Sequence, residues 1–175
     1  MRRFVCLVVV VFILSACSNQ PNIELVEATV DISETTTVGY FPNEGESFNP
    51  NILSYKFVLA NRGNESIGSI KEGIEVTLQP SDKLQRLSEE ILGFNLFDDQ
   101  GKNLIAAKTG EPILLPNQKG EFILDFILIE LISNHEIKNA SPEFLKVLRK
   151  NALDATIVVS SKGNEVARFK LSDQQ

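Results

Sequence analysis

Residues 52–66 read ILSYKFVLANRGNES, and this stretch indicates the fold more clearly than any other part of the chain. Large apolar side chains occupy every second position from Leu53 to Leu59, with serine and lysine between them. This spacing is typical of a β-strand that buries one face and exposes the other. The strand is expected to end in the turn-forming residues Asn61–Asn64.

Similar strand-like stretches recur on both sides of this one. Further strands are predicted at 23–32, 74–78, around Phe94 and Leu96, and at 113–115, 122–128, 154–160 and 166–171. The run 122–128 is apolar on both faces, as expected of a central strand between two layers. The last two strands flank residues 161–164, which read SKGN and predict a hairpin turn. About seven short strands separated by turns predict two packed antiparallel sheets.

Two segments have a helical rather than a strand pattern. Within residues 81–92, Leu84, Leu87 and Ile91 have the spacing of one helix face. Residues 141–152 begin with a serine suited to the N-cap, continue with proline, and carry basic residues near the end. Both predicted helices lie between strands, so we expect insertions packed on the edge or end of a sandwich.

Three quoted segments resemble parts of immunoglobulin-like domains in bacterial surface lipoproteins. YKFVLANRGNESI (55–67) is similar to their second strand, with Asn and Gly letters before a small turn. FNLFDDQGKNL (94–104) followed by LLPNQKGEFIL (114–124) is similar to their order of strand, Asp-Gly turn, proline-led loop and strand. The resemblance covers residues 52–129. It implies a mainly β, immunoglobulin-like two-sheet antiparallel sandwich with one or two short inserted α-helices, and it carries no function.

The amino-terminal segment MRRFVCLVVVVFILSACSNQ has the layout of a secretory signal: two arginines, an apolar run and small residues. The apolar run, residues 4–14, is too short to span a hydrocarbon core of ~30 Å. Leu14–Cys17, which reads LSAC, resembles the lipobox of bacterial lipoproteins. In that family the cysteine thiol receives a diacylglycerol, the chain is cut just before it, and the new amino group is usually acylated.

The lipobox resemblance implies a cleaved signal peptide at 1–16, a lipidated tether at 17–22 that begins with Cys17, and one domain at 23–175. It places the protein on the extracytoplasmic face of the cell membrane, or on the outer membrane of a double-membraned cell. Several acyl chains anchor a protein firmly, because each buried CH₂ contributes ~0.8 kcal/mol. Cleavage would also remove Cys6, so no internal disulfide is expected in the mature chain.

Charge and motif content exclude several function classes. Loss of Arg2 and Arg3 with the signal changes the net charge from −6 to −8, so nucleic acid is not an expected partner. The one histidine, His135, lies in a polar segment, and no nucleotide-binding glycine pattern occurs. Residues 98–103 lack the alternating acids of a calcium loop and are interpreted as a turn. No catalytic residues, metal ligands or cofactors are therefore expected.

The loop 33–51 is the predicted interaction surface, because it is long and polar yet carries Tyr40, Phe41 and Phe48. These aromatic residues either contact a partner or fold back over the open end of the sandwich. The favoured hypothesis is a non-catalytic protein-binding or scaffolding module that recognises another envelope protein through a sheet edge or loops.

Two alternative functions stay open. The first is a ligand-binding accessory lipoprotein, which predicts a pocket between the sheets. The second is a carboxylate-based hydrolase, which predicts acids that converge in a cleft. Glu44 with Glu46, and Glu89 with Glu90, are the carboxylate pairs visible in the sequence.

Overall fold

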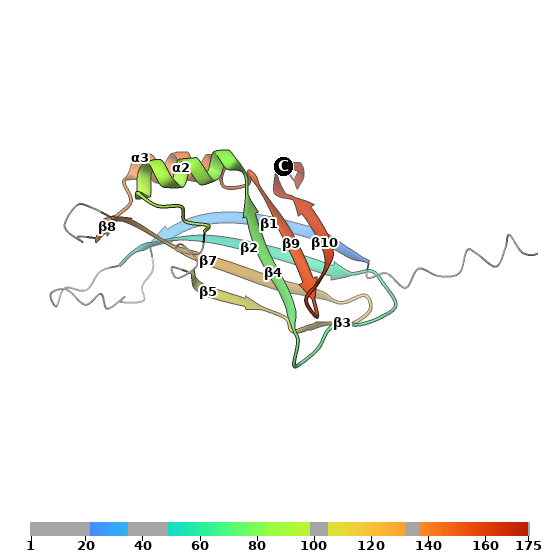
Figure 1. Cartoon of the computed structure of the whole chain (residues 1–175). Coiled ribbons are helices and arrows are strands. Elements are labelled where there is room, and N and C mark those ends of the chain that lie inside the picture. Colours follow the sequence, from blue (N-terminus) through green and yellow to red (C-terminus); the bar gives the residue numbers. More distant parts are fainter. Residues whose placement is uncertain (1–21, 35–48, 99–104, 132–136, 175) are drawn as a thin grey trace, which may run out of the picture.

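The computed structural model describes residues 22–34, 49–98, 105–131 and 137–174, which form two antiparallel sheets packed face to face (Figure 1). The first sheet contains β1 (Ile23–Glu34), β2 (Asn51–Asn61), β7 (Lys119–Leu131) and β5 (Ile105–Gly110), paired in that order, with β8 (Ile137–Asn139) beside the end of β7. The second sheet contains β10 (Asn164–Lys170), β9 (Ala155–Ser161) and β4 (Ile74–Pro80). A small third pair joins β3 (Ile67–Gly68) to β6 (Ile113–Leu114).

The strand order matches that of constant-type immunoglobulin domains. Those domains pair strands A-B-E-D in one sheet and C-F-G in the other. In this chain β1-β2-β7-β5 follows the first order and β4-β9-β10 follows the second, with every neighbouring pair antiparallel. The predicted mainly β, two-sheet antiparallel sandwich with short inserted helices is confirmed.

The alternation in β2 builds the centre of the core. Leu53, Tyr55, Phe57 and Leu59 are all 0% exposed, whereas the residues between them up to Val58 are half-buried. The Tyr55 ring lies 6.1 Å from that of Phe57 and 5.9 Å from that of Phe126 on the neighbouring strand β7. Side chains therefore fill the middle of the space between the two sheets.

Helices α2 (Asp82–Leu92) and α3 (Pro142–Asn151) lie side by side at one end of the sandwich (Figure 1). Each begins at the predicted serine: the Oγ of Ser81 accepts from the N–H of Leu84, and the Oγ of Ser141 accepts from that of Phe144. The α2 helix contacts β7, and α3 contacts β1. The predicted placement of both helices at an edge or end of the sandwich is confirmed.

The strand predicted around Phe94 and Leu96 is wrong. The α2 helix ends at Gly93, which adopts a positive φ of 80°, and both residues lie in the turn that follows. They are buried there, and the N–H of Leu96 donates to Ser88 Oγ at 3.2 Å. Their apolar spacing therefore reflects packing beneath α2 rather than a strand. The edge of the first sheet is instead β5, whose residues show no alternation.

Candidate functional site on the open side of the sandwich

The side of the sandwich between β1 and β10 is closed by the carboxyl-terminal residues. The short 3₁₀-helix η2 (Leu171–Gln174) continues from β10 and contacts both β9 and β1. Leu171 is fully buried in the same core cluster as Leu25 of β1. This side therefore has its apolar interior covered by the chain itself.

The opposite side, between the edge strands β4 and β5, contains two adjoining cavities. The inner cavity has a volume of about 270 Å³, and its floor consists of the buried core residues Val76, Phe122 and Leu124. The outer cavity has a volume of about 530 Å³ and a more charged lining that includes Glu72, Glu75 and Lys162. Gly73, Ile74 and Lys108 line both cavities, which together are called the β4–β5 cleft.

A glycine shapes the floor of this cleft. Gly110 lies directly opposite Phe122 in the register of β5 and β7. A Cβ atom at Gly110 would lie 2.3 Å from Cδ1 of the Phe122 ring, far inside van der Waals contact. Glycine therefore allows the aromatic ring to lie against the edge strand, and aromatic cover of an edge glycine is a known way to stabilise a sheet.

Gly110→Val is expected to displace the Phe122 ring and lower the free energy of unfolding by about 2 kcal/mol, since overpacking a core costs ~1–3 kcal/mol. Urea denaturation followed by circular dichroism measures the change. Gly73→Ala is the matched control, because its nearest neighbour atom would lie 3.5 Å away in ordinary contact. An equal loss in both variants would contradict the proposed packing of Phe122.

The mouth of the cleft carries charges of both signs. Lys108 Nζ on β5 lies 2.9 Å from Glu75 Oε1 on β4, so this ion pair links the two sheets across the opening. Both side chains are more than a third exposed, so the pair adds little stability. Lys162 and Glu72 add one further charge of each sign. The mouth therefore favours a polar, neutral group such as a peptide backbone over a simple anion or cation.

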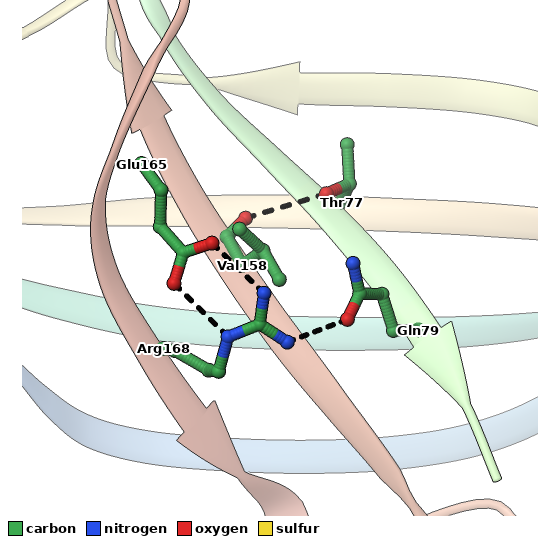
Figure 2. Close-up of polar contacts among 5 residues, drawn as sticks. All are labelled: Thr77, Gln79, Val158, Glu165 and Arg168. Carbon is green, nitrogen blue, oxygen red and sulfur yellow. Dashed lines mark hydrogen bonds and ion pairs between the residues drawn. The ribbon is translucent and has the colours of Figure 1, made fainter.

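The outer face of the second sheet holds a polar cluster (Figure 2). Arg168 donates from Nε and Nη2 to the two carboxylate oxygens of Glu165, at 3.0 and 2.8 Å, and from Nη1 to Gln79 Oε1 at 2.6 Å. The hydrogen bonds to Glu165 raise the pKa of Arg168 and lower the pKa of Glu165. The Arg168 side chain thus spans from β10 to β4 across Val158 of β9, which is 6% exposed.

None of the residues singled out from the sequence is among the described residues that line this cleft. Cys17, Tyr40, Phe41 and Phe48 lie outside the described residues, and so do His135 and the Glu44–Glu46 pair. Glu89 and Glu90 are exposed on α2. The cleft was missed because its lining comes from four separate segments of the chain. The local signals were a glycine at the end of β5 and another just before β4.

Neither a known protein family, nor a curated protein, nor a solved structure matches the chain. Among the residues that the structure describes, no helix has both the length and the apolar character needed to cross a membrane. Within those same ranges, histidine, cysteine and acidic side chains do not gather in groups of three or more that could hold a metal ion. The candidate site is the β4–β5 cleft, because it joins an apolar floor to a polar mouth beside two sheet edges.

Proposed function

We propose that this chain is a lipoprotein anchored through Cys17 to the extracytoplasmic face of a bacterial membrane, and that its sandwich is a non-catalytic protein-binding module of the cell envelope. The match of Leu14–Cys17 to the lipobox supports the location. The observation that carries the binding role is the unequal closure of the two sides of the sandwich. One side is sealed by η2, whereas on the other side no described residue pairs with the outer edges of β4 and β5 beside the β4–β5 cleft.

An exposed sheet edge next to an apolar cavity suits protein recognition for a physical reason. The unpaired N–H and C=O groups of an edge strand are free to pair with another extended chain. A neighbouring cavity then accepts a side chain of that partner and supplies specificity. The cleft combines the two features, since β4 and β5 are outer strands of their sheets and both line it.

A ligand-binding accessory role is the second candidate, and the apolar floor of the inner cavity favours it. Its volume of about 270 Å³ is slightly below the ~300–1,000 Å³ range of small-molecule pockets. The rings of Tyr55, Phe57 and Phe126 occupy the centre between the sheets, so the space is at the side. This candidate would be favoured if the wild type binds a small apolar dye saturably, if Gly73→Leu abolishes that binding, and if the wild type binds no peptide.

The location is tested by expressing the wild-type chain and Cys17→Ala in a bacterial host. The wild type is expected to lose residues 1–16, gain acyl mass and sediment with membranes, because the thiol accepts the lipid. Cys17→Ala is expected to gain no acyl mass. Cys6→Ala is the matched control and should behave as the wild type, since Cys6 lies in the segment to be removed. Intact-mass spectrometry and membrane fractionation measure the result, and an unmodified soluble wild type would overturn the proposal.

The binding role is tested by chemical crosslinking of intact cells that express the lipidated chain. A discrete adduct between the chain and one other envelope protein is expected in the wild type. The adduct should be lost when Gly73→Leu fills the cleft, and should persist in Glu165→Gln on the outer face of the second sheet. A lipidated chain with no such adduct would leave the location intact and contradict the binding role.

A further inference from the structure

Three of the four strands that end the strand orders β1-β2-β7-β5 and β10-β9-β4 contain an extra residue. The register moves from Leu25 to Glu27 in β1, from Ile105 to Ala107 in β5, and from Glu165 to Ala167 in β10. In each case one residue of the outer strand has no partner on the inner strand, which defines a β-bulge. The fourth outer strand, β4, pairs with β9 over seven consecutive residues, Ile74 to Pro80, without a shift.

The bulges protect the edges of β1, β5 and β10 against pairing with another chain, whereas the edge of β4 is available for it. Bulges bend and twist an edge strand, and natural proteins use them to prevent another chain from pairing there. The β4 edge lacks that protection along its full length. Ile74, Glu75 and Val76, in the first half of β4, also line the β4–β5 cleft. The unbulged edge and the cavity are therefore adjacent.

We propose that the outer edge of β4 accepts an extended segment of another protein as an additional strand, and that one apolar side chain of this segment occupies the inner cavity. This inference rests on the proposed protein-binding role and names its surface and the chemistry of the partner. Main-chain hydrogen bonds to β4 provide affinity, and the cavity selects the side chain. Cavities of ~150 Å³ accept a benzene ring, so a cavity of about 270 Å³ accommodates an aromatic or branched aliphatic side chain.

The segment is expected to alternate apolar and polar residues. Successive side chains of a strand point to opposite faces, so one face of the added strand would be turned toward the apolar floor at Phe122 and Leu124. Residues flanking the inserted side chain would meet the mixed charges of Lys108, Glu75 and Lys162 at the mouth. A segment with polar side chains of no strong net charge fits this lining best.

A second copy of this chain fits the edge less well. In β4 itself, Ile74, Val76 and Leu78 already pack against the chain's own core. The side chains between them, such as Thr77, are exposed and polar. If two β4 strands paired with each other, neither would supply an apolar side chain to the inner cavity, which would stay unfilled. A partner segment with its own apolar residue would both pair with the edge of β4 and fill the inner cavity.

The test uses random peptides displayed on phage and selected against the purified full chain. Enriched peptides are expected to share an apolar residue in an alternating pattern. For a synthetic peptide of that pattern, Gly73→Leu should weaken binding by about tenfold or more, because losing a buried anchor costs at least ~1–2 kcal/mol. Gly73→Ala should stay close to the wild type, because a single added carbon at this position makes only ordinary contacts.

A second measurement decides the case where Gly73→Leu does not fold, as judged by circular dichroism. Two versions of the peptide are compared, one N-methylated at its odd-numbered residues and the other at its even-numbered residues. Only one of these two sets of N–H groups would face β4. One register should lose binding and the other should retain it. Equal tolerance of both registers, unchanged binding to Gly73→Leu, failure to enrich peptides, or dimerisation of the chain through β4 would each overturn the inference. None of these outcomes affects the membrane-anchoring result, so the two failures are distinguishable.

Discussion

Replacing Asn61 by aspartate is expected to lower the free energy of unfolding by about 4 kcal/mol at neutral pH, the largest effect of any single substitution proposed for this chain. Asn61 ends β2 and is fully buried. Its Nδ2 donates to the carbonyl oxygens of Glu65, at 2.7 Å, and Leu114, at 3.0 Å, and its Oδ1 accepts from the N–H of Gly63 at 2.9 Å. One side chain thus joins the end of β2, the turn after it and β6.

Aspartate has nearly the same shape as asparagine, but it replaces the amide N–H donors with an acceptor oxygen. A carboxylate accepts the Gly63 hydrogen bond but cannot donate to the two carbonyl oxygens. Burial beside those oxygens would raise the pKa of the introduced carboxyl above its ordinary ~3.9. The folded state would then bind more protons than the unfolded state, so the destabilisation is fully present at neutral pH and diminishes as the pH falls toward 4.

Urea denaturation of the wild type, Asn61→Asp and Asn61→Ala between pH 4 and pH 8 measures this effect. Asn61→Ala is expected to cost about 2–3 kcal/mol at every pH, since it removes the hydrogen bonds without introducing a charge. Asn164→Asp is the matched control, because Asn164 is an exposed residue at the start of β10 whose side chain donates to Lys162 O at 3.2 Å. An Asn61→Asp cost that does not diminish on acidification would contradict the proposed burial of the carboxylate.

The sequence predicted those elements whose pattern is local. The alternation in β2 predicted which face is buried, because one face of that strand packs entirely in the core. The serine before α3 and the proline that begins it predicted its first turn, because capping depends on residues in and next to that turn. The hairpin turn predicted at residues 161–164 (SKGN) is confirmed. Lys162 and Gly163 both adopt positive φ, as a two-residue turn of this type requires.

The errors share a different cause, which is dependence on distant residues. The β5 strand reads IAAKTG and has no alternation, and pairing with β7 alone makes it a strand. Phe94 and Leu96 resembled a strand, but burial beneath α2 determines their position. The β4–β5 cleft was not predicted because Gly73, Lys108 and Phe122 are far apart in the chain and meet only when the sheets pack.

Tyr55 gives the second large effect, and it appears at alkaline pH. Its hydroxyl is fully buried and donates to the carbonyl oxygen of Ala152 at 2.9 Å, which joins β2 to the end of α3. Desolvation by burial raises the pKa of this hydroxyl far above its ordinary value of 10.0. The unfolded chain loses this proton near pH 10 while the folded chain keeps it, so stability is full below that pH and declines above it.

The size of the decline follows from the difference in bound protons. Each pH unit well above 10 is expected to remove ~1.4 kcal/mol, so the free energy of unfolding at pH 12 should be about 2.7 kcal/mol lower than at neutral pH from this residue alone. Tyr55→Phe should cost about 1–2 kcal/mol at neutral pH, because the buried Ala152 carbonyl loses its donor. That variant lacks the Tyr55 decline, so the two stability curves should cross between pH 10 and pH 12.

Denaturation curves across this pH range measure the crossing, and phenolate absorbance near 295 nm reports the ionisation itself. The chain has two tyrosines and no tryptophan, so Tyr55→Phe leaves Tyr40 as the single phenol and supplies the reference titration. Folded wild-type protein should match that reference, and the Tyr55 signal should appear only on unfolding. A Tyr55 phenolate that forms near pH 10 in the folded chain would mean that water reaches the hydroxyl, and that α3 does not seal this end of the core.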